Sequence, residues 1–262
     1  MGEQFTIGIL ETGLVPEELV EKHSSYPDMF TNLLQSDVPT DWKFRAYSPV
    51  QGDFPGDVMD CDAWLITGSK FGAYEDYDWI HRLRGFLTEA YEKDRAIVGI
   101  CFGHQILAEA LGGKVIKSSK GWGCGAHVYD WTDKPDWMQK AEQSLPSREE
   151  GSFAIQAYHQ DQVVDLPRDA NVIAKSDFCY YAALAYQDKA ISFQGHPEFS
   201  PDYSSDLFSL RKGVGLPDDV ADAAIATKEH PLDREVLAKA VVEFLLVYQA
   251  NRTESEPAKK AG

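Results

Sequence analysis

The stretch Val98-Gly99-Ile100-Cys101-Phe102-Gly103-His104-Gln105 decides how this chain folds. An apolar run at 96–100 leads into the cysteine. A second apolar run at 106–111, compatible with a helix, follows it and stops at two glycines. Strand, sharp turn and helix form the local structure of a nucleophile elbow. The glycines on either side allow a tight turn and keep bulk away from the sulfur. The dipole of the following helix favours a thiolate, so Cys101 is predicted to be a nucleophile.

The bulk composition narrows the class of protein. The chain has 262 residues, of which 44% are hydrophobic, and a formal net charge of −17. A chain of this length can bury a large core as one domain. Its acidity disfavours nucleic acid as a partner because a negative surface repels phosphates. No apolar run reaches membrane-spanning length, no secretory signal is present, and the four cysteines show no paired CxxC spacing. These features predict a cytoplasmic protein with reduced thiols and no membrane partner.

Strands and helices alternate through the first part of the chain. The predicted strands are 5–10, 42–47, 61–67 and 96–100. The predicted helices are 16–35, interrupted at Tyr26-Pro27, then 79–93, and the run after Cys101. This alternation is typical of an α/β protein with a mostly parallel sheet covered by helices on both faces. Sites in such sheets lie beyond the carboxyl ends of the strands, where Gly68 and Cys101 both fall.

The pattern changes from residue 114 onward. Short β-like runs predict antiparallel or mixed strands at 114–118, 125–131, 152–157, 172–175, 182–187 and 190–194. Helical patterns follow at 206–228 and 233–250. No linker divides the chain, so residues 1–251 are predicted to form a single domain. Residues 252–262 are charged and rich in small side chains, which predicts a flexible C-terminal tail.

A second motif, Phe193-Gln194-Gly195-His196-Pro197-Glu198, follows the last predicted strand. A cysteine nucleophile needs a base that takes its proton, and the base needs an acceptor that orients it. His196 suits the first role. Glu198 suits the second, because side chains two residues apart on an extended backbone point to the same side. A surface histidine with a solvated glutamate is the alternative, but the elbow at Cys101 favours a catalytic triad of Cys101, His196 and Glu198.

A turn at 67–72 follows the third predicted strand. Attack on a carbonyl develops an oxyanion, which backbone N–H groups can stabilise. The N–H groups of Ser69, or Gly68, and of Phe102 are the candidate donors. An ordinary turn is the alternative for this segment. The glycine spacing of a phosphate-binding loop is absent.

The remaining candidate residues lie in the second half of the chain. His159 and Asp161 form a rival catalytic pair, a structural pair or part of the substrate-facing lining, and the last interpretation is preferred. The glycine-rich loop that carries Trp122 either closes over a substrate or is a plain hairpin connection. Gln105 and Trp122 are also expected to bind the substrate. No metal or other cofactor is predicted, because no ligand pair with a recognised spacing is found among Cys101, His104, His127, His159 and His196.

The two motifs around Cys101 and His196 together resemble those of the class I glutamine amidotransferase family, which uses a Cys-His-Glu triad. The resemblance covers residues 5–203. It implies a flavodoxin-like sheet with a small additional antiparallel sheet. It also implies that the cysteine attacks a small-molecule γ-glutamyl amide, that ammonia or an amine leaves, and that water releases glutamate from the thioester. Gly68 and His159 would then line the substrate site.

One departure from the family pattern concerns the oxyanion turn. Many members carry Gly-Gly-Pro where this chain has Gly68-Ser69-Lys70, and a backbone donor tolerates that change. Together with Asp78-Trp79-Ile80, this turn is more similar to a branch of stand-alone γ-glutamyl peptidases, known from plants acting on glutathione conjugates. A γ-glutamyl hydrolase is therefore the favoured function. A glutaminase supplying ammonia to a separate synthetase subunit and a non-catalytic regulatory protein remain open.

Overall fold

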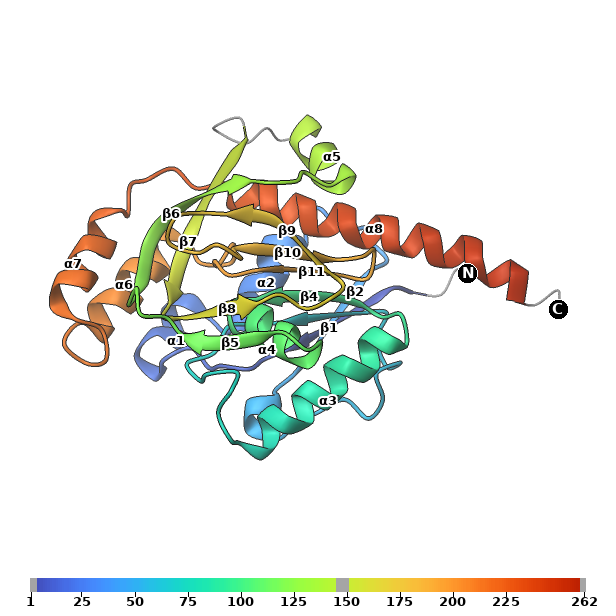
Figure 1. Ribbon diagram of the computed structural model, residues 1–262, viewed down its shortest axis with the longest axis horizontal. Coiled ribbons are helices and arrows are strands. Elements are labelled where there is room, and N and C mark those ends of the chain that lie inside the picture. The colour runs from blue at the N-terminus through green and yellow to red at the C-terminus, as the bar shows by residue number, and fades with distance from the viewer. Residues whose placement is uncertain (1–3, 145–150, 260–262) are drawn as a thin grey trace.

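The computed structural model describes residues 4–144 and 151–259 (Figure 1). The strands are β1 (Thr6–Leu10), β2 (Lys43–Tyr47), β3 (Ala63–Ile66), β4 (Ala96–Ile100), β5 (Lys114–Lys117), β6 (Gly123–Trp131), β7 (Ser152–His159), β8 (Asp161–Asp165), β9 (Ala170–Lys175), β10 (Ala183–Tyr186) and β11 (Ala190–Phe193). The helices are α1 (Glu17–His23), α2 (Tyr26–Leu34), α3 (Asp78–Glu92), α4 (Phe102–Ala110), α5 (Asp136–Ser144), α6 (Pro201–Arg211), α7 (Asp218–Ala226) and α8 (Arg234–Lys259).

One mixed sheet organises the fold. Within the described residues it has nine strands in the order β2-β1-β3-β4-β11-β10-β9-β6-β7. The strands from β2 to β11 run parallel, and those from β10 to β7 pair antiparallel. A small second sheet joins β5 to β8 in antiparallel fashion. The predicted α/β architecture with a small additional antiparallel sheet is confirmed, although most of the late strands extend the main sheet.

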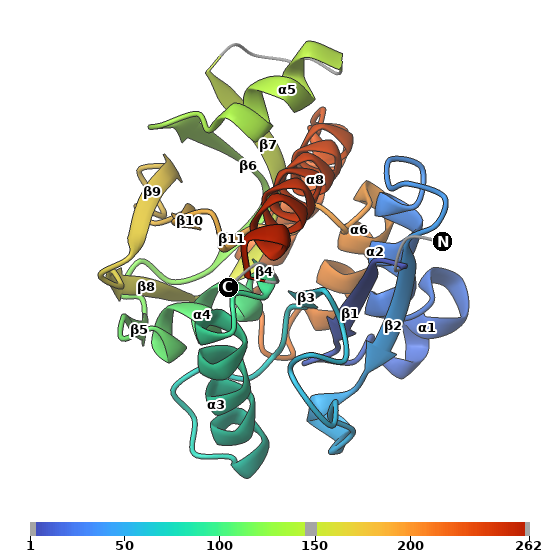
Figure 2. The same ribbon diagram turned by 90° about the vertical axis from the view of Figure 1, so that its right-hand side faces the viewer.

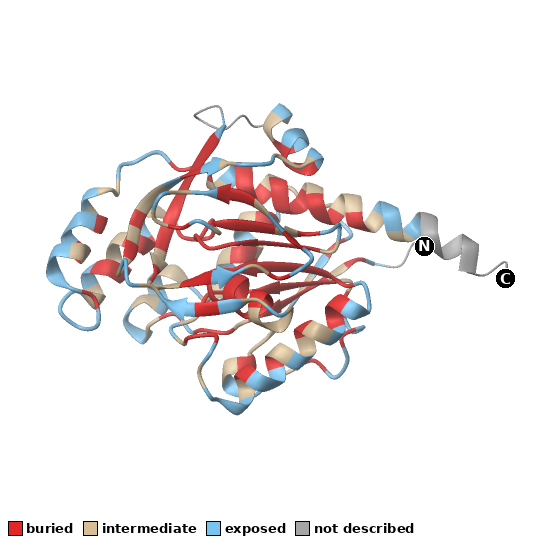
Figure 3. Ribbon diagram, in the orientation of Figure 1, coloured by how far each residue is buried: buried red, intermediate tan, exposed pale blue. Residues whose placement is uncertain are grey.

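Helices cover both faces of this sheet (Figure 2). On one face, α2, α5 and α8 pack over a cluster that includes Phe30, Met138 and Leu237. On the other face, α3 and α4 pack over a cluster that includes Leu83 and Ile106. Burial on both faces explains why β4 is apolar at every position, as strands in the middle of a parallel sheet are (Figure 3).

Two glycines set the close approach of β4 and α4. A Cβ atom on Gly99 would lie 2.6 Å from the carbonyl oxygen of Gly103, and a Cβ atom on Gly103 would lie 2.4 Å from that of Ile66. Both distances are far below van der Waals contact, so only hydrogen fits at either position. These glycines therefore place the start of α4 directly over the carboxyl ends of β3 and β4.

We expect Gly103→Ala to lower the free energy of unfolding by about 1–3 kcal/mol, because the added methyl group meets rigid backbone. Urea denaturation measures this. Gly85→Ala is the matched control, since Gly85 is exposed on α3 and a Cβ atom there meets nothing within 4 Å. That variant should instead gain roughly 0.5–1 kcal/mol from helix propensity. A Gly103→Ala protein as stable as the wild type would contradict the close approach.

The first predicted helix is broken as expected. Helix α1 ends at His23 and α2 begins at Tyr26, with Pro27 in its first turn. The side chain of Ser25 accepts from the backbone N–H of Asp28, and Asp28 accepts in return from the backbone N–H of Ser25. This capping box fixes the start of α2.

Other boundaries differ from the sequence-based expectations. The single helix predicted at 206–228 is two helices, α6 and α7, because Gly213 and Gly215 adopt positive φ angles of 70° and 94° between them. Strand β8 was not predicted. Helix α8 runs past residue 252, where the flexible tail was predicted to begin, and residues 260–262 of that tail lie outside the described residues. The domain boundary and the flexibility of the tail stay predictions.

None of the described helices combines the length and the apolar character that a bilayer crossing requires.

Candidate active site

Cys101 lies at the junction between β4 and α4. Its backbone has φ 53° and ψ −101°, outside the regions that residues with a side chain normally adopt. Such strain costs on the order of 1–3 kcal/mol and is concentrated at functional sites. The residue is 4% exposed, and its Sγ lies 3.9 Å from the carbonyl oxygen of Tyr158. The geometry is that of an elbow, as the sequence predicts.

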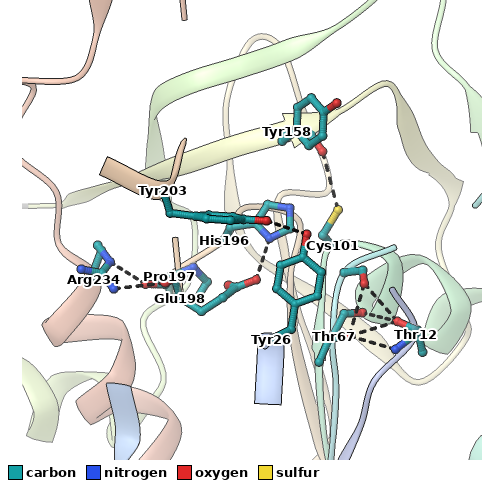
Figure 4. Close-up of polar contacts among 11 residues, drawn as sticks. Thr12, Tyr26, Thr67, Cys101, Tyr158, His196, Pro197, Glu198, Tyr203 and Arg234 are labelled. Atoms are coloured by element: carbon teal, nitrogen blue, oxygen red, sulfur yellow. Dashed lines mark hydrogen bonds and ion pairs between the residues drawn. The ribbon is translucent and has the colours of Figure 1, made fainter. Parts of the chain in front are cut away.

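His196 and Glu198 follow β11 as a buried pair (Figure 4). The Nδ1 atom of His196 lies 2.8 Å from Oε1 of Glu198. The backbone N–H of His196 donates to the carbonyl oxygen of Gln156 at 2.7 Å, and its ring stacks on Phe199 with centroids 3.9 Å apart. The imidazole is therefore held by Glu198 and Phe199, its backbone is held by Gln156, and its Nε2 atom is left for a neighbour across the site.

That neighbour is Cys101. A Cβ atom on Gly68 would lie 2.7 Å from Cε1 of His196 and 3.6 Å from Cβ of Cys101, so the two side chains meet beside this glycine. Burial by itself lowers the pKa of His196. The charges of Cys101 and Glu198, and hydrogen bonding to both, outweigh burial and raise that pKa to about 10. The arrangement favours the protonated imidazolium of His196 beside Cys101 at neutral pH.

The sheet itself sets the spacing of these residues. In the parallel pair of β11 and β4, Phe193 is in register with Ile100, and the N–H of Cys101 donates to the carbonyl oxygen of Phe193 at 2.8 Å. Cys101 and His196 thus leave two neighbouring strands at the same edge. Carboxyl ends of adjacent parallel strands are the usual place for sites in such folds.

Three supporting contacts come from residues that sequence reasoning did not assign to the site. Arg234 donates from Nε to the carbonyl oxygen of Pro197 at 2.8 Å and from Nη2 to that of Glu198 at 3.2 Å. The hydroxyls of Tyr26 and Tyr203 lie 2.9 Å apart, next to the pair of His196 and Glu198. The hydroxyl of Thr12 donates to the carbonyl oxygen of Thr67 at 2.8 Å and so braces the turn before Gly68. No local sequence signal marks these pairings, because each joins segments distant in the chain.

A cleft of about 650 Å³ opens over Cys101. The predicted site residues that line it are Gly68, Ser69, Cys101, Gln105, Trp122, His159 and His196. Glu198 lies behind His196, and Phe102 is fully buried in the first turn of α4. The volume lies in the range of roughly 300–1,000 Å³ that is typical of small-molecule sites.

Two of the predicted substrate-binding residues are already engaged with the protein. Gln105 donates from Nε2 to the carbonyl oxygen of Asp161 at 3.0 Å and to Oε1 of Gln194 at 3.2 Å. Nδ1 of His159 lies 3.1 Å from the same carbonyl oxygen of Asp161. Burial lowers the pKa of His159 to about 3, which makes it a weak base. This disfavours the rival pair of His159 and Asp161, whose carboxylate lies 3.3 Å from the hydroxyl of Tyr74 instead.

Trp122 and Ser69 both line the cleft, and Phe102 lies buried next to Cys101. The ring of Trp122 stacks on that of Tyr158, with centroids 5.4 Å apart and planes 16° apart. The backbone N–H groups of Ser69 and Phe102 donate to no other group in the parts of the chain that the structure describes. Both are therefore available to a ligand. Their role in binding an oxyanion stays a prediction.

The five residues weighed for a metal site do not gather into one. Nδ1 of His104 lies 2.8 Å from the hydroxyl oxygen of Ser192, and burial lowers the pKa of this histidine to about 3. No cluster of three or more His, Cys, Asp or Glu side chains suited to a metal ion is found among residues 4–144 and 151–259.

The four thiols should differ strongly in reactivity. Burial raises the pKa of Cys61 to about 11 and those of Cys124 and Cys179 to about 12, which leaves them almost wholly protonated at pH 7. Cys101 faces an imidazolium and lines the cleft. We expect iodoacetamide at pH 7 to modify Cys101 at least about tenfold faster than the other three, as followed by peptide mass spectrometry. His196→Gln should remove this advantage. Equal rates at all four thiols would contradict an activated Cys101.

Comparisons with known proteins agree with the architecture and the motifs. The family model described as glutamine amidotransferase class-I matches residues 48–209, a range that contains Cys101, His196 and Glu198. A glutamine amidotransferase-like protein of Schizosaccharomyces pombe is 30% identical over 260 residues, covering 92% of this chain and 99% of its own length. Gamma-glutamyl peptidase 5 of Arabidopsis thaliana is 33% identical over 187 residues, covering 69% and 72%.

A solved structure shows the same fold. The glutamine amidotransferase of Thermotoga maritima superposes with a TM-score of 0.73 over 94% of this chain and 98% of its own, at 18% sequence identity. At that identity the likeness concerns the fold alone. The family model and the Schizosaccharomyces relative carry the assignment further: this chain belongs to the class I glutamine amidotransferase family.

Proposed function

We propose that this protein is a thiol hydrolase that cleaves a γ-glutamyl amide bond. The observation that carries the proposal is the buried pair of His196 and Glu198 beside the strained elbow of Cys101, with Cys101 and His196 lining the cleft. An activated thiol, a base and an orienting carboxylate are the groups that acyl transfer through a thioester requires. Membership of the family supports glutamine-like substrates.

The mechanism assigns each group one task. His196 takes the proton of the Cys101 thiol as Sγ attacks the γ-carbonyl carbon, and the oxyanion accepts hydrogen bonds from the N–H groups of Ser69 and Phe102. As the tetrahedral intermediate collapses, the C–N bond breaks and the imidazolium of His196 gives its proton to the departing nitrogen. The γ-glutamyl group is then a thioester of Cys101. His196 takes a proton from water, which attacks the thioester and releases glutamate and the thiol. Glu198 keeps the imidazole oriented through Nδ1.

Peptides are better candidates for the substrate than glutamine alone. Gamma-glutamyl peptidases are among the similar proteins, and the cleft of about 650 Å³ has room for a leaving group larger than ammonia. The second candidate is a glutaminase that passes ammonia to a separate synthetase subunit. It uses the same acyl-enzyme but needs only glutamine as the donor.

A substrate panel tests the proposal. The purified protein, with no partner added, is incubated with glutamine, glutathione, γ-glutamyl dipeptides and γ-glutamyl amines, and released glutamate is measured. We expect glutamate from the dipeptides at a higher kcat/KM than from glutamine. Hydrolysis of glutamine alone would favour the glutaminase. No glutamate from any member of the panel would contradict the hydrolase and favour a non-catalytic role.

A further inference from the structure

Arg211 is a cation of the cleft without an acidic partner. It is half-buried at the end of α6 and lines the same cleft as Cys101. Of the other cleft cations, Lys70 lies 5.4 Å from the centroid of the Phe71 ring, and the charge of Lys117 acts on the carboxylate of Asp161. Among the described residues, none forms an ion pair or a side-chain hydrogen bond with Arg211. In a chain of net charge −17, an uncompensated guanidinium that faces a cleft is suited to an anionic ligand.

We propose that Arg211 binds a carboxylate on the leaving group, so that the enzyme selects γ-glutamyl amino acids and short γ-glutamyl peptides over neutral amides. This inference rests on the proposed hydrolase. It concerns the leaving group, the half of the substrate that the proposed reaction does not specify. A guanidinium suits this role because its planar fork can bind both oxygens of a carboxylate.

The position of His196 gives the direction of the leaving group. His196 must stand next to the departing nitrogen, because it supplies the proton. The residue on the other face of its ring is Phe199, from which the chain enters α6. Leu207 and Arg211 lie four residues apart on one face of α6, and both line the cleft. The leaving group therefore extends from His196 along α6, while the acyl half lies toward the turn at Gly68.

Tyr158 indicates how far the leaving group reaches. Its carbonyl oxygen contacts Sγ of Cys101, and its ring lies 5.6 Å from that of Phe208, one turn before Arg211 on α6. The charge of Arg211 acts on the phenol of Tyr158, so the thiol and the guanidinium both lie near this one residue, an arrangement suited to a short leaving group. Beyond it the cleft opens into a groove of about 450 Å³ lined by Trp122 and Pro217, where a longer peptide side chain can extend.

A pair of substrates that differ only in the carboxylate tests the proposal. These are γ-glutamylalanine and γ-glutamylalaninamide, and the readout is the ratio of their kcat/KM values. We expect the wild type to favour the carboxylate by roughly 10- to 100-fold, the worth of one charge-assisted contact. Arg211→Ala should bring the ratio close to one by slowing γ-glutamylalanine, and Arg211→Lys should retain part of it. Lys212→Ala is the matched control, because Lys212 pairs with Asp222 outside the cleft and should leave the ratio unchanged.

The outcomes separate this inference from the proposed function. A thermal melt of each variant checks that it is folded, and Arg211→Lys keeps a cation at the position if Arg211→Ala unfolds. Equal slowing of both substrates by a folded Arg211 variant would mean that Arg211 serves the glutamyl half, which overturns the inference. An unchanged ratio overturns it as well. If the wild type releases glutamate from neither substrate, the hydrolase proposal itself fails.

Discussion

Cys101→Ala should abolish the release of glutamate from every γ-glutamyl substrate, with a loss in kcat of at least about 10⁴-fold. The side chain supplies the sulfur that forms the thioester in the proposed mechanism, and among the described residues no other cysteine lines the cleft. The loss should fall on kcat, because the residues that bind the substrate are unchanged. The rate of glutamate release at saturating concentration of each substrate measures this loss in kcat.

Controls make this result specific to the nucleophile. Cys61→Ala also removes a buried thiol, but one that does not line the cleft, so the activity per folded molecule should stay near that of the wild type. Adding His196→Ala to the Cys101→Ala variant should cost little more, because members of a triad act as a unit. Glu198→Ala by itself should leave more activity than either of the other two losses. Turnover retained by Cys101→Ala would contradict the triad.

Gly68→Ala is expected to lower kcat by about 10²-fold per folded molecule. The added methyl group would lie 2.7 Å from Cε1 of His196. The ring cannot retreat freely, because it is bonded to Glu198 on one edge and stacked on Phe199. The imidazole must therefore shift away from Cys101, and a displacement of the order of 1 Å is enough for a loss of this size.

The comparison variant for Gly68→Ala is Gly85→Ala, which adds the same methyl group on the exposed face of α3. Its kcat should equal that of the wild type. Urea denaturation of both proteins shows whether any loss of activity comes from unfolding. An unchanged kcat in a folded Gly68→Ala protein would mean that His196 is less constrained than its contacts indicate, and would weaken its assignment as the base.

Local patterns carried most of what the sequence could predict. The elbow is visible because its glycines sit at fixed offsets from Cys101, where the strand and helix approach most closely. The contact between His196 and Glu198 is visible because the two residues are separated by a single proline. Family membership and the α/β fold are shown, whereas the roles of the individual site residues stay predictions.

Long-range contacts were not predictable from the same patterns. Arg234 lies 36 residues from Glu198 in the chain, yet its guanidinium fixes the backbone there. Strand β8 was not predicted, because its only pairing is with β5, which is distant in sequence. The end of α6, by contrast, was predictable from the sequence. Gly213 and Gly215 indicate a break in the predicted helix at 206–228, which places Arg211 at the end of a helix and not in its interior.

The register of β11 against β4 has a consequence for how the specificity of this protein can change. Cys101 and His196 follow two adjacent strands, which backbone hydrogen bonds hold about 4.8 Å apart. Substituting a side chain does not change this separation of the strands. Helix α6 and the groove beside it contribute nothing to that spacing. If the proposed function is correct, substitutions on α6 can therefore change which leaving group is preferred while the positions of Cys101, His196 and Glu198 stay the same.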